Sequence, residues 1–180
     1  MKTYQFRLPF FKLSQHPAAL IDEEGRKVGD VRRYFNRWWQ WWADWVFHSW
    51  ICHVQARDGE GRECADFREV VNTWKSWIRC TWNVVIEDGS GRRSEGVLTD
   101  RTVVRPRQRL LFERSDLKVE VERNWGDRTV RFRDGETGCL MAEARPEHLV
   151  WPHDVRLAVY DERLTAFEAA CIYHLLCLKY

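Results

Sequence analysis

The segment 165–178 places the strongest constraint on how this chain can fold. Thr165-Ala-Phe-Glu168 has the pattern of a capping box, in which each end residue accepts a hydrogen bond from the backbone amide of the other. The residues that follow, 169–178, are apolar on nearly every side, and such a helix must be buried all round or lie in lipid. Because spanning a bilayer takes roughly 20 apolar residues, we expect a helix over residues 165–178 that the surrounding protein encloses.

The rest of the chain alternates between apolar and polar residues with a period of two. The clearest stretches are 50–57, 82–86, 117–122 and 155–159. This alternation is typical of antiparallel strands that have one buried face and one face in water. We therefore expect a mainly β chain around the C-terminal helix.

Four turns of one design separate these strand-like stretches. They are Asp22-Glu-Glu-Gly25, Asp58-Gly-Glu-Gly61, Asp88-Gly-Ser-Gly91 and Asp134-Gly-Glu-Thr-Gly138. Asp supplies side-chain hydrogen bonds and Gly supplies positive φ, as tight hairpins require, and the ligand spacing of a calcium loop is missing. A meander of about twelve strands that encloses a helix removes its exposed edges by closing into a barrel.

This arrangement of repeated hairpins and a final apolar helix resembles the tubby C-terminal-like superfamily, which includes the LURP-one-related proteins and the phospholipid scramblases. The resemblance covers essentially the whole chain and is closest in residues 4–25, 155–161 and 164–178. It implies one domain over residues 1–180, a closed antiparallel barrel of about twelve strands around a central C-terminal helix. In tubby itself, basic residues on the barrel wall hold phosphoinositide headgroups, but the resemblance assigns none of those residues to positions here.

A tryptophan-rich segment at about residues 34–50 departs from the family pattern. Four of its indoles recur at i, i+3, i+4 and i+7, the spacing of one helix face: Trp38, Trp41, Trp42 and Trp45. We favour a short helix, or two strand ends, that covers one mouth of the barrel, because burying each indole contributes on the order of a few kcal/mol. One alternative is a membrane-interface anchor in which Arg32, Arg33 and Arg37 meet lipid phosphates; another is a base-stacking platform.

Arginine dominates the basic residues, at 23 of 29, and suits bidentate contacts with phosphate or carboxylate. The formal charge of +2 is too balanced for a dedicated nucleic-acid binder. The candidate lipid-binding residues are Arg92, Arg93, Arg101, Arg105, Arg107 and Arg109. Those at odd positions from 101 to 109 would point one way along an extended segment and form a phosphate-binding stripe. The alternative is a solvated strand face paired with nearby acids.

No sequence motif points to catalysis or to a bound metal. The chain has no GxSxG, P-loop or HExxH motif, and His148 and His153 beside Asp154 are too few ligands for a metal site. We expect His174 to be a hydrogen-bonded core residue. The six cysteines form no CxxC pair and no signal peptide precedes them, which favours reduced thiols in the cytoplasm. We expect no catalytic residues, no metal and no cofactor.

These observations support a non-enzymatic binding protein, peripheral to a membrane and without a transmembrane span. Its ligand would be an anionic phospholipid or phosphoinositide headgroup, and not a nucleic acid. A second hypothesis is a protein-interaction scaffold that docks a partner on the tryptophan-rich segment, since Trp and Arg are frequent anchor residues. A third is a hydrolase with a Cys/His pair, although no local sequence activates any cysteine.

Overall fold

Twelve strands and one long helix make up the regular secondary structure in the part of the chain that the computed structural model describes. The described residues are 1–9, 14–38, 40, 42, 51–71, 79–87, 89, 91–103, 107–124, 126, 128–147 and 154–180. The elements are β1 (Lys2–Arg7), β2 (Ala18–Asp22), β3 (Lys27–Tyr34), β4 (His53–Asp58), β5 (Glu63–Glu69), β6 (Thr81–Glu87), β7 (Arg93–Asp100), β8 (Arg107–Arg114), β9 (Leu117–Asn124), β10 (Val130–Asp134), β11 (Leu140–Pro146), β12 (Asp154–Val159) and α2 (Ala166–Lys179).

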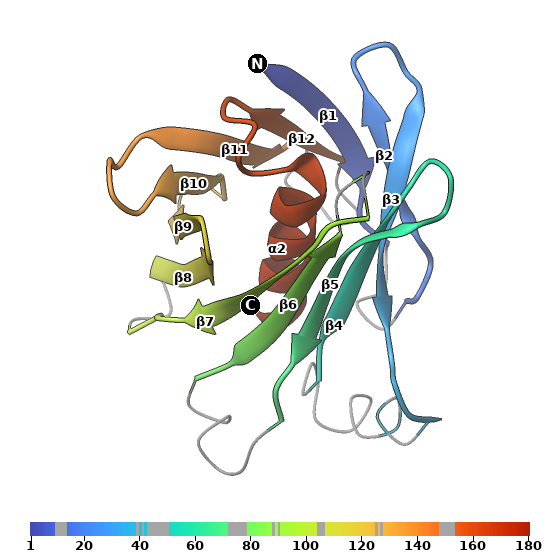
Figure 1. The fold of residues 1–180 in the computed structure, drawn as a ribbon, viewed down its shortest axis with the longest axis horizontal. Coiled ribbons are helices and arrows are strands. Elements are labelled where there is room, and N and C mark those ends of the chain that lie inside the picture. Colours follow the sequence, from blue (N-terminus) through green and yellow to red (C-terminus); the bar gives the residue numbers. More distant parts are fainter. Residues whose placement is uncertain are drawn as a thin grey trace.

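The strands close into a barrel around α2 (Figure 1). Every strand pairs antiparallel with its neighbours in the chain, and β1 also pairs with β12, so that Lys2 lies opposite Val159. The sequence-based prediction of a closed antiparallel barrel around a C-terminal helix is confirmed.

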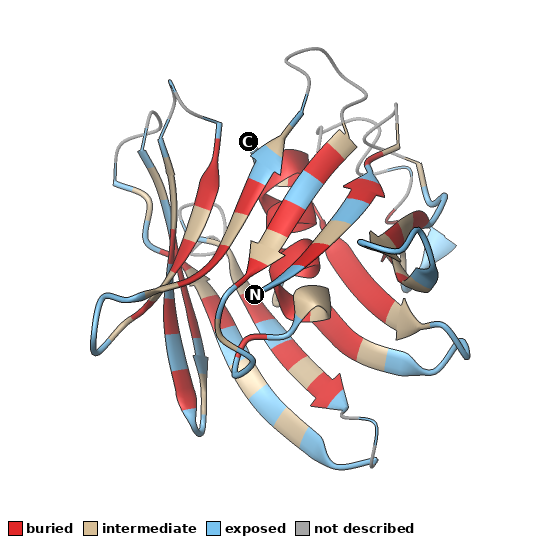
Figure 2. Cartoon of the chain, turned by 90° about the horizontal axis from the view of Figure 1, so that it is seen from above, coloured by how far each residue is buried: buried red, intermediate tan, exposed pale blue. Residues whose placement is uncertain are grey.

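Alternating side chains build the barrel wall, as the banding along the strands in Figure 2 shows. In β9, Val119 and Val121 are buried and point inward, whereas Lys118 and Glu120 between them are exposed. β4 departs from the expected alternation, because His53 and Gln55 on its other face are buried as well.

The central helix α2 begins with the predicted capping box. The Glu168 backbone N–H donates to Thr165 Oγ1 at 3.2 Å, and the Thr165 N–H donates to Glu168 Oε2 at 2.7 Å. All side chains from Glu168 to Leu178 are buried, with Ile172 at 0% and Leu176 at 1% exposure, which confirms the enclosed helix. In the described part of the chain, no helix has the length and apolar character needed to cross a membrane.

The predicted Asp–Gly turns join strands where the sequence placed them. Asp22 Oδ1 accepts from the backbone N–H groups of Glu24 and Arg26, at 3.0 and 2.8 Å. Asp58 Oδ1 accepts in the same way from Glu60 and Arg62. The closing glycines have positive φ, from 71° at Gly138 to 84° at Gly61. Asp88 lies outside the described residues.

Strict antiparallel order sorts the connections onto two ends of the barrel. The turns β2–β3, β4–β5, β6–β7, β8–β9 and β10–β11 lie at one end, together with the first turn of α2; we call this the hairpin end. The connections β3–β4, β5–β6, β7–β8, β9–β10 and β11–β12 lie at the opposite end with the last turn of α2; we call this the loop end.

Candidate functional site

The barrel separates the candidate arginines into two groups. Arg92 and Arg93 lie at the start of β7 and therefore at the hairpin end, whereas Arg101 follows β7 and Arg107 begins β8 at the loop end. β7 has eight residues, so the two groups are roughly 25 Å apart along the strand. The candidate arginines therefore lie at two ends of the barrel, and one headgroup cannot contact both groups. Arg105 lies outside the described residues.

The described arginines at the loop end lie just after β7 and at the start of β8. The backbone N–H of Arg101 donates to the carbonyl of Arg109 at 2.8 Å, and Arg101, Arg107 and Arg109 are all exposed. Arg109 forms an ion pair with Glu122 on β9, as the solvated-face alternative expects. In the described part of the chain, neither Arg101 nor Arg107 forms an ion pair, so both guanidinium groups face water.

The tryptophan-rich segment begins at the same end, after β3. Trp38, Gln40 and Trp42 have helical backbone, and Gln40 Oε1 accepts from the backbone N–H groups of Asn36 and Arg37, at 2.8 and 3.1 Å. Gln40 is buried, whereas Trp38 is 80% exposed and Trp42 is 54% exposed. The expected burial is therefore wrong for these two indoles, because the capping amide of Gln40 occupies the inward side of the turn.

The other two indoles of the predicted helix face and the arginines of the membrane-anchor hypothesis have different outcomes. Trp41 and Trp45 lie outside the described residues. Arg33, which the anchor hypothesis directed toward lipid phosphates, is fully buried and donates to the carbonyl of Ile51 at 2.7 Å. Arg37, next to Trp38, is exposed.

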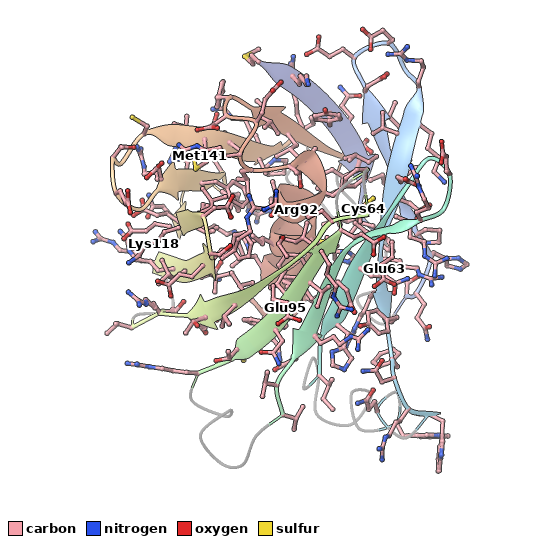
Figure 3. The ribbon with its side chains drawn as sticks, viewed as in Figure 1. Glu63, Cys64, Arg92, Glu95, Lys118 and Met141 are labelled. Atoms are coloured by element: carbon pink, nitrogen blue, oxygen red, sulfur yellow. The ribbon has the colours of Figure 1, made fainter. Side chains whose placement is uncertain are left out.

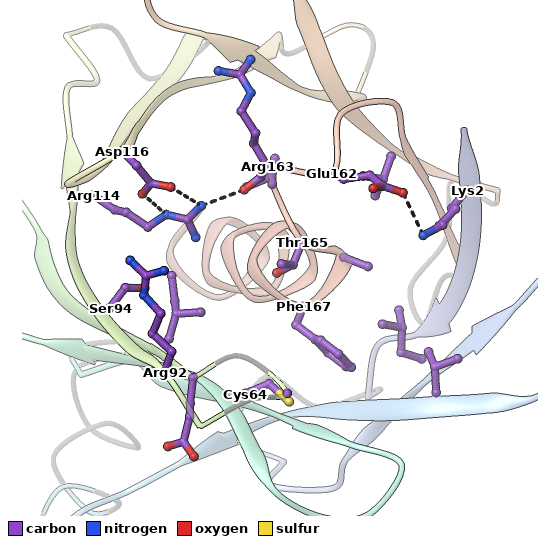
Figure 4. Close-up of a pocket in the computed structure, with 18 of the residues that line it drawn as sticks. Lys2, Cys64, Arg92, Ser94, Arg114, Asp116, Glu162, Arg163, Thr165 and Phe167 are labelled. Carbon is purple, nitrogen blue, oxygen red and sulfur yellow. Dashed lines mark hydrogen bonds and ion pairs between the residues drawn. The ribbon is translucent and has the colours of Figure 1, made fainter.

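A cavity of about 710 Å³ opens at the hairpin end, next to the start of α2 (Figure 4). Its apolar lining includes Tyr4, Leu20, Val28, Ile86, Ala166 and Phe167. The ring of Phe167 lies against the backbone of β3, where a Cβ on Gly29 would come within 2.6 Å of it. Gly29 is thus needed for the close approach that forms this wall.

Two ion pairs form the rim of the cavity. Lys2 Nζ lies 3.0 Å from Glu162, and Arg114 Nε lies 2.8 Å from Asp116 (Figure 4). Arg114 also donates to Glu168 at 2.6 Å and to the carbonyl of Arg163 at 2.8 Å, so its guanidinium links the wall to the start of α2.

These contacts shift the pKa values of Asp116 and Glu168. Partial burial tends to raise the pKa of Asp116, but the hydrogen bond and charge of Arg114, together with the charge of Arg92, hold this pKa below its usual value. Burial raises the pKa of Glu168, and the charge of Arg114 opposes that shift. The helix start is therefore held by a buried charge pair that the sequence did not reveal.

A second buried network fixes the other end of α2. Lys179 Nζ lies 2.7 Å from Glu69 Oε1, and Glu69 Oε2 accepts from the backbone N–H of Cys52 at 2.7 Å. The hydroxyl of Tyr180 donates to Asp100. Both ends of the helix are thus tied to the barrel wall by charged or polar contacts.

Burial shifts the pKa values of several cysteines and histidines. None of the six cysteines, all of which lie in the described part of the chain, forms a disulfide, and burial raises the pKa of Cys80 to about 11, which disfavours a reactive thiolate. Burial lowers the pKa of His174 to about 3. His174 is a core residue, as expected, but its Nδ1 has no hydrogen-bond partner in the described part of the chain. His148 and His153 lie outside the described residues. Among the residues described, no group of three or more His, Cys, Asp or Glu side chains is placed to hold a metal ion.

Comparisons with known proteins agree with this architecture. The family model of the Tubby C-terminal like domain matches residues 4–180. An X-ray structure of a protein from Arabidopsis thaliana is similar in fold, with a TM-score of 0.53 at 14% sequence identity over 99% of this chain and 92% of that chain. No curated protein matches this sequence.

Proposed function

Because this chain belongs to the Tubby C-terminal-like domain family, we propose that it is a non-enzymatic binding protein that docks its loop end on a membrane surface rich in anionic phospholipid. Domains of this family generally bind ligands and do not catalyse reactions. The proposal adds the ligand class and the face of the barrel that meets it.

The observation that carries the proposal is the exposure of Trp38 and Trp42 at the same end as Arg101 and Arg107. Indoles are favoured at the level of lipid headgroups, where the ring is apolar and its N–H remains hydrated. Arginine binds phosphate oxygens through paired N–H groups. The loop end thus carries both indole rings and guanidinium groups, the two kinds of side chain that bind favourably to an anionic membrane surface.

The spacing of these groups favours a surface over a single headgroup. The tryptophan turn follows β3 and the arginines flank the β7–β8 connection, four strands further round the barrel. At about 4.8 Å per strand, the two groups are roughly 19 Å apart around the wall. A flat, multiply charged ligand such as a bilayer can contact both groups at once.

Vesicle flotation tests the proposal directly. The wild-type protein should float with vesicles of phosphatidylcholine and phosphatidylserine, and far less with phosphatidylcholine alone. The bound fraction should fall with added salt, because the Debye length shortens from about 10 Å at 0.1 M to about 3 Å at 1 M. Equal binding to both kinds of vesicle, or to neither, would overturn the proposal.

A protein scaffold is the second candidate, because two exposed indoles also suit a protein hot spot. The Trp38→Ser/Trp42→Ser variant separates the two functions. Membrane docking requires this variant to float less than the wild type. If the wild type does not float but captures a partner protein that the variant loses, the scaffold is the correct function.

A further inference from the structure

We propose that the cavity at the hairpin end is a second binding site, which takes the aliphatic chain of a single-chain amphiphile with an uncharged polar head. This site lies at the opposite end of the barrel from the proposed membrane-docking surface. Its ligand and its test are therefore independent of that surface.

The size and lining of the cavity fit a small apolar ligand. Its volume of about 710 Å³ lies within the range of roughly 300–1,000 Å³ that ligand pockets occupy. Partly exposed apolar side chains that pack on the described core gather here, namely Tyr4, Val28, Ala166 and Phe167. Part of the accessible surface of the core thus faces this cavity.

The walls of the cavity are fixed before any ligand enters. The ring of Phe167 packs against Gly29, where a Cβ would come within 2.6 Å of the ring and within 2.2 Å of the carbonyl oxygen of Arg57. The capping box and the pair between Arg114 and Glu168 fix the helix turn that carries Phe167. A preformed apolar wall lowers the entropic cost of binding.

The rim selects the head group through its balance of charge. Lys2 is matched by Glu162, and the donors of Arg114 are engaged by Asp116, Glu168 and a backbone carbonyl. Arg92 extends from the β6–β7 turn toward Asp116, and its charge helps to lower the pKa of Asp116 (Figure 4).

Arg163, which also lines the cavity, is paired with Asp134 and Asp161. The other two charged lining residues, Arg92 and Glu87, are opposite in sign. The rim therefore offers little net charge to offset the desolvation of a charged head. A hydroxyl can hydrogen-bond to these groups without that cost. The rim thus favours an uncharged polar head over a carboxylate, in contrast to the anionic lipids proposed for the loop end.

Thiol footprinting can report occupancy, because Cys64 lines the cavity beside Arg92 (Figure 3). Cys139, an exposed residue of the β10–β11 turn outside the lining, is an internal control. The protein is treated with N-ethylmaleimide in the presence of octanol, nonanol or decanol, and the labelling rate of each cysteine is measured by mass spectrometry.

The alcohols should slow the labelling of Cys64 and leave that of Cys139 unchanged. The half-protecting concentration should fall roughly fourfold for each added methylene. Carboxylates of equal chain length, below their micelle concentrations, should need higher concentrations than the alcohols. Absence of protection, protection without dependence on chain length, or tighter binding of the carboxylates would overturn the proposal.

A variant that fills the cavity, compared with the same substitution outside it, gives a matched test. Val28→Phe places a larger side chain in the cavity, whereas Val97→Phe makes the same change at a residue of β7 that is 40% exposed and outside the lining. We expect Val28→Phe to raise the half-protecting concentration of decanol at least tenfold and Val97→Phe to leave it unchanged. If Val28→Phe fails to fold, Ala166→Leu makes the same test from the helix side. Equal protection in the filled variant and the wild type would contradict the site.

Discussion

Arg114 Nη1 donates to Glu168 Oε1 at 2.6 Å, and this contact joins β8 of the barrel wall to the first turn of the central helix. The Arg114 side chain is 10% exposed and that of Glu168 is 0% exposed, so the pair is almost completely removed from water. Removing one partner leaves the other charge buried without compensation, which typically costs about 3–5 kcal/mol.

We therefore expect Arg114→Met to lower the free energy of unfolding by about 3–5 kcal/mol. The double variant Arg114→Met/Glu168→Leu should recover much of this loss, because no buried charge remains, although it gives up the capping box. Urea unfolding of the three proteins measures both effects. If Arg114→Met were as stable as the wild type, the charge of Arg114 would not be needed to compensate the buried carboxylate of Glu168.

Burial of α2 gives a second prediction about stability. Leu176→Ala should cost roughly 2–5 kcal/mol, because Leu176 is 1% exposed inside the barrel. Val97→Ala on the outer wall should change stability by no more than about 0.5 kcal/mol. Thermal and urea unfolding provide the comparison, and equal midpoints for the two variants would contradict an enclosed helix.

His174 should make the fold sensitive to acid. Its pKa is about 3 in the folded protein and about 6.5 in the unfolded chain. Between these two pH values, the imidazole of His174 is protonated in the unfolded chain and neutral in the folded protein. The stability that depends on neutral His174 is therefore present above pH 6.5 and is lost as the pH falls toward 3.

The variant His174→Leu isolates this effect. Between pH 7 and pH 5 the wild type should lose about 2 kcal/mol more stability than the variant. His53, whose pKa burial lowers to about 4, and the buried Glu69 and Glu168 are present in both proteins, so their contributions cancel. Parallel stability profiles for the two proteins would show that His174 does not titrate in this way.

The exposed indoles give a spectroscopic prediction. Trp38 and Trp42 should emit at long wavelength in water and shift to shorter wavelength when anionic vesicles are added, because the rings enter the headgroup region. The difference spectrum between the wild type and Trp38→Phe/Trp42→Phe isolates these two residues from the other tryptophans. A difference spectrum that vesicles leave unchanged would mean that the indoles remain in water.

Local patterns predicted most of the fold. The capping box at Thr165 and the Asp–Gly turns depend on residues close in sequence, and the alternation of β9 and β12 follows from the two faces of a strand. Closure of the barrel followed from a helix with no polar face. The pairing of Arg114 with Glu168 could not be predicted in this way, because it joins residues that only the closed barrel brings together.

The burial expected for Trp38 and Trp42 was wrong, and the candidate arginines lie at two ends of the barrel; these two outcomes have different causes. Helical spacing identified a common face for Trp38 and Trp42, but periodicity does not say which side of a helix meets the protein, and Gln40 occupies that side. The separation of Arg93 from Arg101 was implicit in the strand pattern, since residues that begin and end one strand lie at opposite ends of a barrel.

Flotation of two matched double variants tests the membrane-docking proposal most directly. Arg101→Gln/Arg107→Gln removes two charges from the loop end, and Arg93→Gln/Lys118→Gln removes two from the hairpin end. Each basic residue near an anionic surface contributes about 1 kcal/mol, so the loop-end variant should partition onto phosphatidylserine vesicles roughly 30-fold more weakly than the wild type. The hairpin-end variant should bind nearly as well as the wild type. Equal losses in the two variants, or no loss in the loop-end variant, would contradict docking through the loop end.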